Sequence, residues 1–149
     1  MIRLRTSALR RGGDRGSASV EVAVIAPAII ALLGLMVAFG RVTDADGAVD
    51  AAAHAAARAA SLERDATSAQ TQARAAADDS LSGDGVTCQS TDVTVDTSGY
   101  SLDVGQAATV SATVSCTARL SDIGLPGLPG AKTLTATFTS PIDTYRGRQ

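Results

Sequence analysis

The longest apolar run of the chain lies near its N-terminus. From Val22 to Phe39, eighteen successive residues carry no charge, and ten of them are Val, Ile, Leu or Phe. That length is at the lower end of what a helix needs to cross a bilayer. At roughly −0.3 to −0.6 kcal/mol for each such side chain near the bilayer centre, insertion gains a few kcal/mol before the costs of Pro27 and Gly34. We therefore predict one membrane-spanning helix over residues 20–42.

A cleaved secretory signal peptide is the alternative interpretation of this run. Signal peptides usually have an apolar stretch of about 7–15 residues, followed by small residues at the cut. The sequence Ala45-Asp46-Gly47 matches such a cut poorly. The length of the run therefore favours a span that is retained.

The pattern stays helical after the apolar run. Between residues 48 and 60 the polar residues Asp50, His54 and Arg58 recur at four-residue spacing, which places them on one face of a helix. The opposite face is nearly all Ala. Such a face suits close packing against another helix, in the same molecule or in a neighbour, although the high helix propensity of Ala explains the composition equally well.

A second helix is predicted from about Ala66 to Leu81. The turn Ser82-Gly83-Asp84-Gly85 ends it, because Gly and Asp after a periodic segment are typical of a helix stop. Residues 43–84 are accordingly interpreted as an Ala-rich external helical region.

The hydrophobic period changes to two after residue 85, which predicts strands with one apolar face each. Apolar residues alternate with Thr, Ser, Asp or Arg in three stretches, namely Val93 and Val95; Val110, Ala112, Val114, Cys116, Ala118 and Leu120; and Leu134, Ala136 and Phe138. A shorter alternation at Tyr100, Leu102 and Val104 fits either a fourth strand or an extended loop. An antiparallel sheet with one apolar face must be covered, and the preceding helix is available for that.

These patterns define the fold class as α+β. We expect a long N-terminal transmembrane helix that continues into the Ala-rich helical region, followed by a small antiparallel sheet of three or four strands. Residues 85–149 form the external strand-rich region, and residues 1–19 form a basic cytoplasmic leader.

The distribution of charge sets the expected topology. Residues 1–20 carry five arginines and one acid, whereas residues 42–149 carry seven bases and thirteen acids. Positive flanks stay on the cytoplasmic side of a membrane, so residues 1–20 are expected inside and the chain from Arg41 onward outside. The basic cluster abuts an apolar span and has no aromatic residues between its arginines, which favours membrane topology over nucleic-acid binding.

The two cysteines, Cys88 and Cys116, both fall in the predicted external region. An oxidising compartment permits a disulfide between them, and closing a loop of nearly thirty residues would stabilise the fold by roughly 3–4 kcal/mol. Only four aromatic residues are present, and one of them lies in the span, so the external core is expected to be thin and to need such help. Two free buried thiols are the rival interpretation.

Clustered catalytic side chains are lacking. His54 is the sole histidine, so a zinc site with two His or a Ser-His-Asp triad of the familiar kind lacks supporting residues, and we interpret His54 as a surface helix residue. We therefore expect no enzymatic activity, no metal and no cofactor. A secreted enzyme released by signal cleavage is the least favoured class.

The junction before the span carries the functional signal. It reads Arg15-Gly16-Ser17-Ala18-Ser19-Val20-Glu21, and the apolar run follows directly. A structural explanation of Glu21 is that Ser19 caps the helix and Glu21 lies in its first turn, stabilised by the positive helix end. A carboxylate at the edge of the lipid is nevertheless costly unless it is paired.

A basic leader, a Gly, and a Glu five residues later at the start of an apolar helix resemble type IV pilin-like precursors. In that family, prepilin peptidase cuts after the Gly. The resemblance implies cleavage between Gly16 and Ser17, with Glu21 as the fifth residue of the mature chain. It also implies a subunit contact for Glu21, namely the free amine of a neighbouring subunit, which sets the axial register between packed helices.

Within that superfamily the chain resembles TadE-like proteins, the minor pilins or pseudopilins of tight-adherence (Flp-type) pilus systems. The likeness is carried by residues 16–23, by Pro27 within the apolar run, and by Phe39-Gly40-Arg41 at its exit. The Ala-Ala-Arg-Ala-Ala element at residues 56–60 and the ending Pro141-Ile142-Asp143-Thr144-Tyr145-Arg146 extend it. Major Flp-type pilins usually follow the Glu with Tyr, and Val22 stands there, which argues against the major subunit.

The expected function is assistance in the assembly or initiation of a tight-adherence pilus. The expected partners are membrane lipid, other pilin-like subunits, the pilus assembly machinery and prepilin peptidase, without nucleic acid. The alternative is a single-pass, membrane-anchored extracellular binding module unrelated to pili.

Overall fold

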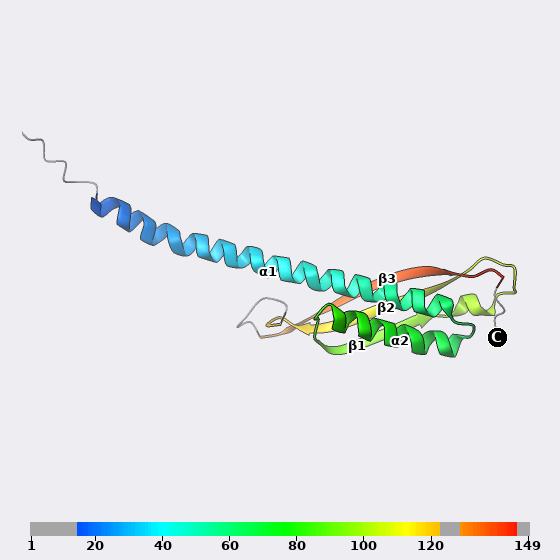
Figure 1. The fold of residues 1–149 in the computed structure, drawn as a ribbon. Coiled ribbons are helices and arrows are strands. Elements are labelled where there is room, and N and C mark those ends of the chain that lie inside the picture. The colour runs from blue at the N-terminus through cyan, green and yellow to red at the C-terminus, as the bar shows by residue number, and fades with distance from the viewer. Residues whose placement is uncertain (1–14, 123–128, 146–149) are drawn as a thin grey trace, which may run out of the picture. The chain divides into compact units, whose positions relative to one another are not determined.

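A computed structural model describes residues 15–122 and 129–145, with the backbone alone for residues 15–19. The chain divides into two compact units, Met1–Val37 and Ala38–Gln149, which are described separately. Along the chain the elements are α1 (Arg15–Leu62), α2 (Ala66–Gly83), β1 (Cys88–Asp96), the 3-10 helix η1 (Ser98–Ser101), β2 (Ala108–Arg119) and β3 (Ala131–Ile142). Figure 1 shows these elements in order. The predicted α+β class, with a long N-terminal apolar helix before an antiparallel sheet, is confirmed.

The long helix α1 begins earlier than the capping pattern predicts. Because it starts at Arg15, Ser19 is inside the helix and Glu21 lies in its second turn. The expectation that Ser19 is the N-cap and Glu21 a first-turn residue is therefore wrong. Helix propagation adds one hydrogen bond per residue, so one Gly near the end, which costs about 1 kcal/mol, does not stop the helix.

The second helix, α2, starts at the N-cap residue Asp65, which the sequence analysis did not predict. The Asp65 carboxylate accepts a hydrogen bond from the backbone N–H of Ser68 at 2.8 Å, as an N-cap residue does. This backbone hydrogen bond, followed by one from the Ser68 hydroxyl, lowers the pKa of Asp65 below its ordinary value. α2 ends at Gly83, within the predicted turn, and buries the i, i+4 row Ala69, Ala73, Ala77 and Leu81.

The three strands form one antiparallel sheet in the order β1-β2-β3. Burial alternates along β2, where Val110, Ala112, Val114, Cys116 and Ala118 point to the covered face. Cys116 lies opposite Thr91 of β1 and Leu134 of β3 in the register. The alternation in the sequence thus predicted the strands and the covered face.

The segment with Tyr100, Leu102 and Val104 forms no strand. Residues 98–101 form η1, and the chain then continues as a loop to β2. The Asp96 carboxylate accepts a hydrogen bond from the backbone N–H of Ser98 at 3.0 Å, and this bond turns the chain out of β1. The same bond is the main reason why the pKa of Asp96 is lowered. The loop interpretation of this segment is therefore correct.

Both helices contribute to the core that covers the inner face of the sheet. The cluster contains 21 buried residues from α1, α2 and the three strands, and 13 of these are Ala. Small side chains let helices and strands approach closely, so the core gains its contacts from proximity rather than from large side chains. The Ala face of α1 therefore packs against other elements of the same molecule, and not against a neighbouring molecule.

Candidate membrane and subunit-contact site

The N-terminal part of α1 exposes apolar side chains on all sides. Twelve large apolar side chains between residues 20 and 39 are exposed, at fractions from 47% for Ile25 to 69% for Ile30. The most apolar 18-residue window of the helix has a mean hydropathy of 2.7, and 6% of it is buried. A helix that is apolar all round needs lipid or other protein around it. This helix is long and apolar enough to span a membrane, as membrane anchoring requires.

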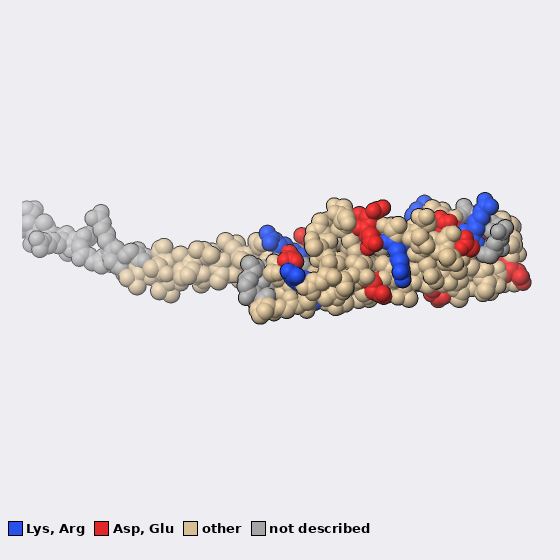
Figure 2. Space-filling model, turned by 90° about the horizontal axis from the view of Figure 1, so that it is seen from below, with Lys and Arg blue, Asp and Glu red and all other residues tan. Residues whose placement is uncertain are grey.

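Figure 2 shows how charge separates along the chain. On the face drawn, Lys, Arg, Asp and Glu gather over the Ala38–Gln149 unit. The stretch from Val22 to Phe39 carries none. The boundary at Arg41 is therefore a boundary between a surface compatible with hydrocarbon and one that requires water.

Glu21 is the one acid beside this apolar surface. Its side chain is exposed, and among the side chains described it forms no ion pair. An exposed carboxylate at the end of a lipid-compatible helix is available to a cation from outside the chain. Gly16 and Ser17 lie one turn or more before it in the backbone of α1. Residues 1–14 of the basic leader lie outside the described residues.

The predicted polar row of α1 is exposed, and it meets β3. Asp50, His54 and Arg58 are all exposed, and the His54 ring stacks on the half-buried Phe138 ring with centroids 3.4 Å apart. One helical turn before Asp50, the carboxylate of Asp46 lies 3.8 Å from the ammonium of Lys132. Both side chains are about half exposed, so this pair adds little stability. His54 is therefore a surface residue whose ring packs over the half-buried ring of Phe138 of β3.

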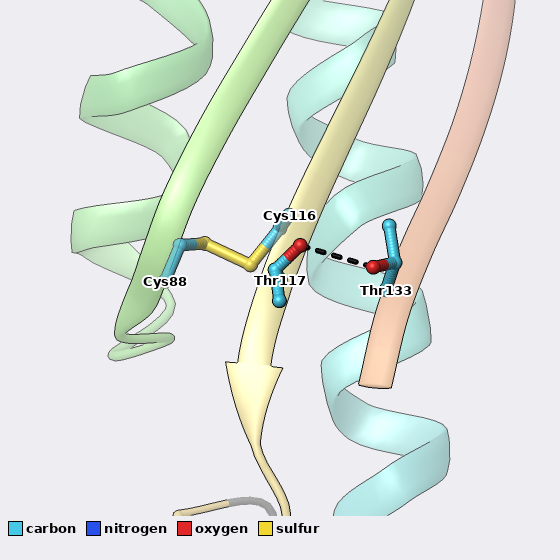
Figure 3. Close-up of a disulfide and its surroundings, with 4 residues drawn as sticks. All are labelled: Cys88, Cys116, Thr117 and Thr133. Carbon is cyan, nitrogen blue, oxygen red and sulfur yellow. Dashed lines mark hydrogen bonds between the residues drawn. A yellow bond between two sulfur atoms is a disulfide. The ribbon is translucent and has the colours of Figure 1, made fainter. Parts of the chain in front are cut away.

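The two cysteines are joined. Cys88 of β1 and Cys116 of β2 form a disulfide with a Cα–Cα distance of 5.5 Å across a sequence separation of 28 residues (Figure 3). Cys116 is fully buried in the core, whereas Cys88 is half-buried beside a register shift in β1. The bond ties β1 to the central strand. Val93 is the one buried residue of β1, so the strand has little other apolar packing.

The outer face of the sheet carries paired hydroxyl groups. Thr113 and Thr137 lie 2.8 Å apart, and Thr117 and Thr133 lie 3.0 Å apart, each pair bridging β2 and β3. Figure 3 shows Thr117 and Thr133 in front of the sheet and α1 behind it. Cross-strand Thr pairs each stabilise a sheet by about 0.2–1 kcal/mol. These pairs therefore strengthen the β2-β3 pairing through polar side chains.

A second exposed apolar surface lies at the end of the domain where α1 terminates. Outside residues 20–39, the exposed large apolar side chains of the described part are Leu62, Leu102, Val104 and Tyr145. Leu62 and Tyr145 line one hollow with residues 140–144, and Leu102 lines a second hollow with residues 141, 142 and 144. Exposed apolar side chains gathered at one place are typical of a contact surface.

Groups that hold metals are not found in the part of the chain that the structure describes. No three His, Cys, Asp or Glu side chains lie close enough together there to ligate an ion.

The comparison with known families finds a match that covers nearly all of α1. Residues 16–58 match the family model described as TadE-like protein, which covers the junction, the apolar helix and most of the Ala-rich stretch. The resemblance predicted from the junction is confirmed over these residues. No curated protein and no solved structure matches the chain. Residues 59–149, with the sheet and the disulfide, lie outside the matched segment.

Proposed function

We propose that this TadE-like protein is a minor pilin or pseudopilin that helps to initiate or assemble a tight-adherence pilus. The observation that carries the proposal is the exposed apolar helix of residues 20–39, which lies within the matched family segment and has no cover of its own. Lipid covers it before assembly, and the helices of other pilin-like subunits cover it afterwards. The protein acts through packing and charge pairing, without enzymatic chemistry.

The proposed topology places the leader in the cytoplasm and the Ala38–Gln149 domain outside. Five arginines precede the span and the domain is acidic, which is the charge asymmetry that keeps an N-terminus inside. The disulfide supports an external domain, because such bonds persist in oxidising compartments.

Glu21 supplies the proposed contact between subunits. In the lipid environment its carboxylate is costly unless a cation neutralises it, and its own chain provides no ion-pair partner among the described side chains. Cleavage between Gly16 and Ser17 by prepilin peptidase would create such a cation, the free amine of Ser17 of a neighbouring subunit. The pair would fix the axial position of one helix against the next.

Replacement of Glu21 tests this role. Glu21→Gln keeps the shape of the side chain and removes its charge, so we expect the protein to reach the membrane at the normal level and pilus number to fall at least tenfold, by electron microscopy. Asp50→Asn, an exposed acid of α1 within the domain, is the matched control and should leave pili unchanged. Normal pilus number with Glu21→Gln would refute the contact.

Processing is tested by N-terminal sequencing of the membrane-extracted protein. The proposal expects a chain that begins at Ser17. A chain that begins at Met1 would show an uncut anchor and remove the amine from the proposed pair. A chain that begins near Ala48 would show a secreted protein and overturn the membrane role.

A membrane-anchored binding module is the second candidate function. It is favoured by the exposed apolar side chains of Leu62, Leu102 and Tyr145, which line the two hollows beside residues 140–144. Such a module needs the span only as an anchor, so it would keep its function when residues 22–39 are replaced by an unrelated apolar helix. A pilin-like subunit would lose pilus assembly in that chimera, because the helix itself makes the contacts.

A further inference from the structure

The two edges of the sheet are protected unequally. The edge strand β1 has a register shift between Cys88 and Ser90 and carries Asp92 and Asp96, two devices by which proteins prevent unwanted strand pairing. β3 pairs with β2 without a register shift, and from residue 133 to 140 it has neither a charge nor a proline.

We propose that the free edge of β3 binds an extended segment of another polypeptide by strand addition. Within the residues that the structure describes, no strand pairs with this edge. An edge presents a row of backbone N–H and C=O groups at strand spacing, and only another extended backbone matches that row. Lys132 and Pro141 bracket the open stretch, so the partner pairs over about eight residues.

The side chains around this edge define what the partner carries. The outer face of β3 presents Thr135, Thr137 and other hydroxyl residues that already pair across β2, so hydroxyl side chains on the partner extend the same ladder. On the inner face, α1 reaches β3 through the contact between His54 and Phe138. The inner-face residues Leu134, Ala136 and Phe138 of β3 are apolar, so apolar side chains on the partner continue that row. The partner is therefore a segment in which Ser or Thr alternates with apolar residues.

The probe for this site is a peptide that already has the required alternation. A twelve-residue peptide with the sequence of residues 108–119, carrying Cys116→Ser, reproduces β2, which pairs with β3 on its other edge. Labelled peptide is titrated with the full chain in detergent micelles, and binding is followed by fluorescence anisotropy. Hydrogen exchange of the protein is measured in the same samples.

Two methylated peptides make the test specific to strand addition. Alternate residues of a strand direct their N–H groups to the same edge. One peptide is therefore N-methylated at Thr109, Ser111 and Thr113. The other is N-methylated at Val110, Ala112 and Val114. A strand bound through one edge loses at least about tenfold in affinity in one of these peptides and keeps its affinity in the other.

Hydrogen exchange supplies the internal control. Peptide binding should slow exchange at alternate amides of β3 and leave the amides of β1 unchanged. Absence of binding by the parent peptide, equal binding by both methylated peptides, or protection on β1 would each overturn the proposal. Protection of β3 that rises with protein concentration without peptide would identify a second copy as the occupant and would also overturn it. None of these results depends on pilus assembly.

Discussion

The bond between Cys88 and Cys116 is expected to supply a large part of the stability of the Ala38–Gln149 unit. A cross-link lowers the entropy of the unfolded chain by about 2.1 + 1.5R ln n cal/mol/K, where n is the length of the closed loop. For a sequence separation of 28 residues this amounts to roughly 3.6 kcal/mol at 25 °C. With an unfolding entropy of about 2.1 cal/mol/K for each residue of the Ala38–Gln149 unit, removal of the bond should lower its Tm by roughly 15 °C.

The assay compares three forms of the full chain in detergent. The first is oxidised, the second is reduced and kept reduced, and the third carries Cys88→Ala and Cys116→Ala. Reduction removes the cross-link but keeps both sulfur atoms in place, so it isolates the effect of the bond. The double variant also removes the Cys116 sulfur from a fully buried position, and it should be less stable than the reduced protein by a further 1 kcal/mol or so.

Loss of the disulfide is expected to destabilise β1 before the other strands. β1 has little apolar burial besides Val93, so the disulfide is the main tie of this strand to β2 apart from backbone pairing. After reduction, hydrogen exchange should accelerate in β1 before it accelerates in β2 or β3. A reduced protein with a Tm within about 2 °C of the oxidised form would refute the chain-entropy reasoning, as would uniform acceleration across the sheet.

Three further changes test single contacts. Asp65→Ala removes the cap of α2 and should lower the Tm by a few degrees. Because the folded-state pKa of Asp65 is lowered, the stabilisation by its charge is present above about pH 4 and is lost as pH falls through the folded-state pKa. The Tm values of wild type and variant should therefore converge as the pH is lowered. Gly99→Ala places a methyl group in steric overlap with the carbonyl oxygen of Thr109 and should cost roughly 1–3 kcal/mol by denaturant unfolding, whereas an unchanged midpoint would show that the backbone shifts to relieve the overlap. Tyr100→Phe removes the hydroxyl that donates to the Ala60 carbonyl and should cost about 1 kcal/mol; equal stability of the two proteins would show that water replaces the hydroxyl.

The sequence predicted the parts of the fold that depend on periodicity. Alternation placed β2 and β3 and identified their covered faces, and four-residue spacing placed Asp50, His54 and Arg58 on the exposed side of α1. Both patterns are local, because strand and helix geometry alone convert them into faces. The family resemblance of the junction likewise rested on a short run of adjacent residues, and residues 16–58 match the family model.

The features that the sequence missed depend on residues far apart or on competing local signals. Nothing local indicates that His54 stacks on Phe138 or that Tyr100 donates to the Ala60 carbonyl, because these contacts arise only when α1 lies on the sheet. The start of α1 was misplaced because Ser19 is a good capping residue in isolation, yet the helix continues past it to Arg15. Asp65 could have been found, since an Asp directly before a predicted helix is a typical N-cap residue.

The composition of the core explains why such contacts matter in this domain. An Ala side chain removes little apolar surface from water, so a cluster in which 13 of 21 residues are Ala gains less from burial than one of Leu and Phe. Each segment at the margin of the cluster is therefore held by a specific bond: β1 by the disulfide, the start of α2 by the Asp65 cap, and η1 by the Tyr100 hydrogen bond. The apolar stretch from residue 20 to 37 adds nothing to this core, because its side chains remain exposed. The two parts of the chain thus differ in their chemistry: most large apolar side chains lie exposed on the N-terminal part of α1, whereas the Ala38–Gln149 unit depends on close packing and a few directed bonds.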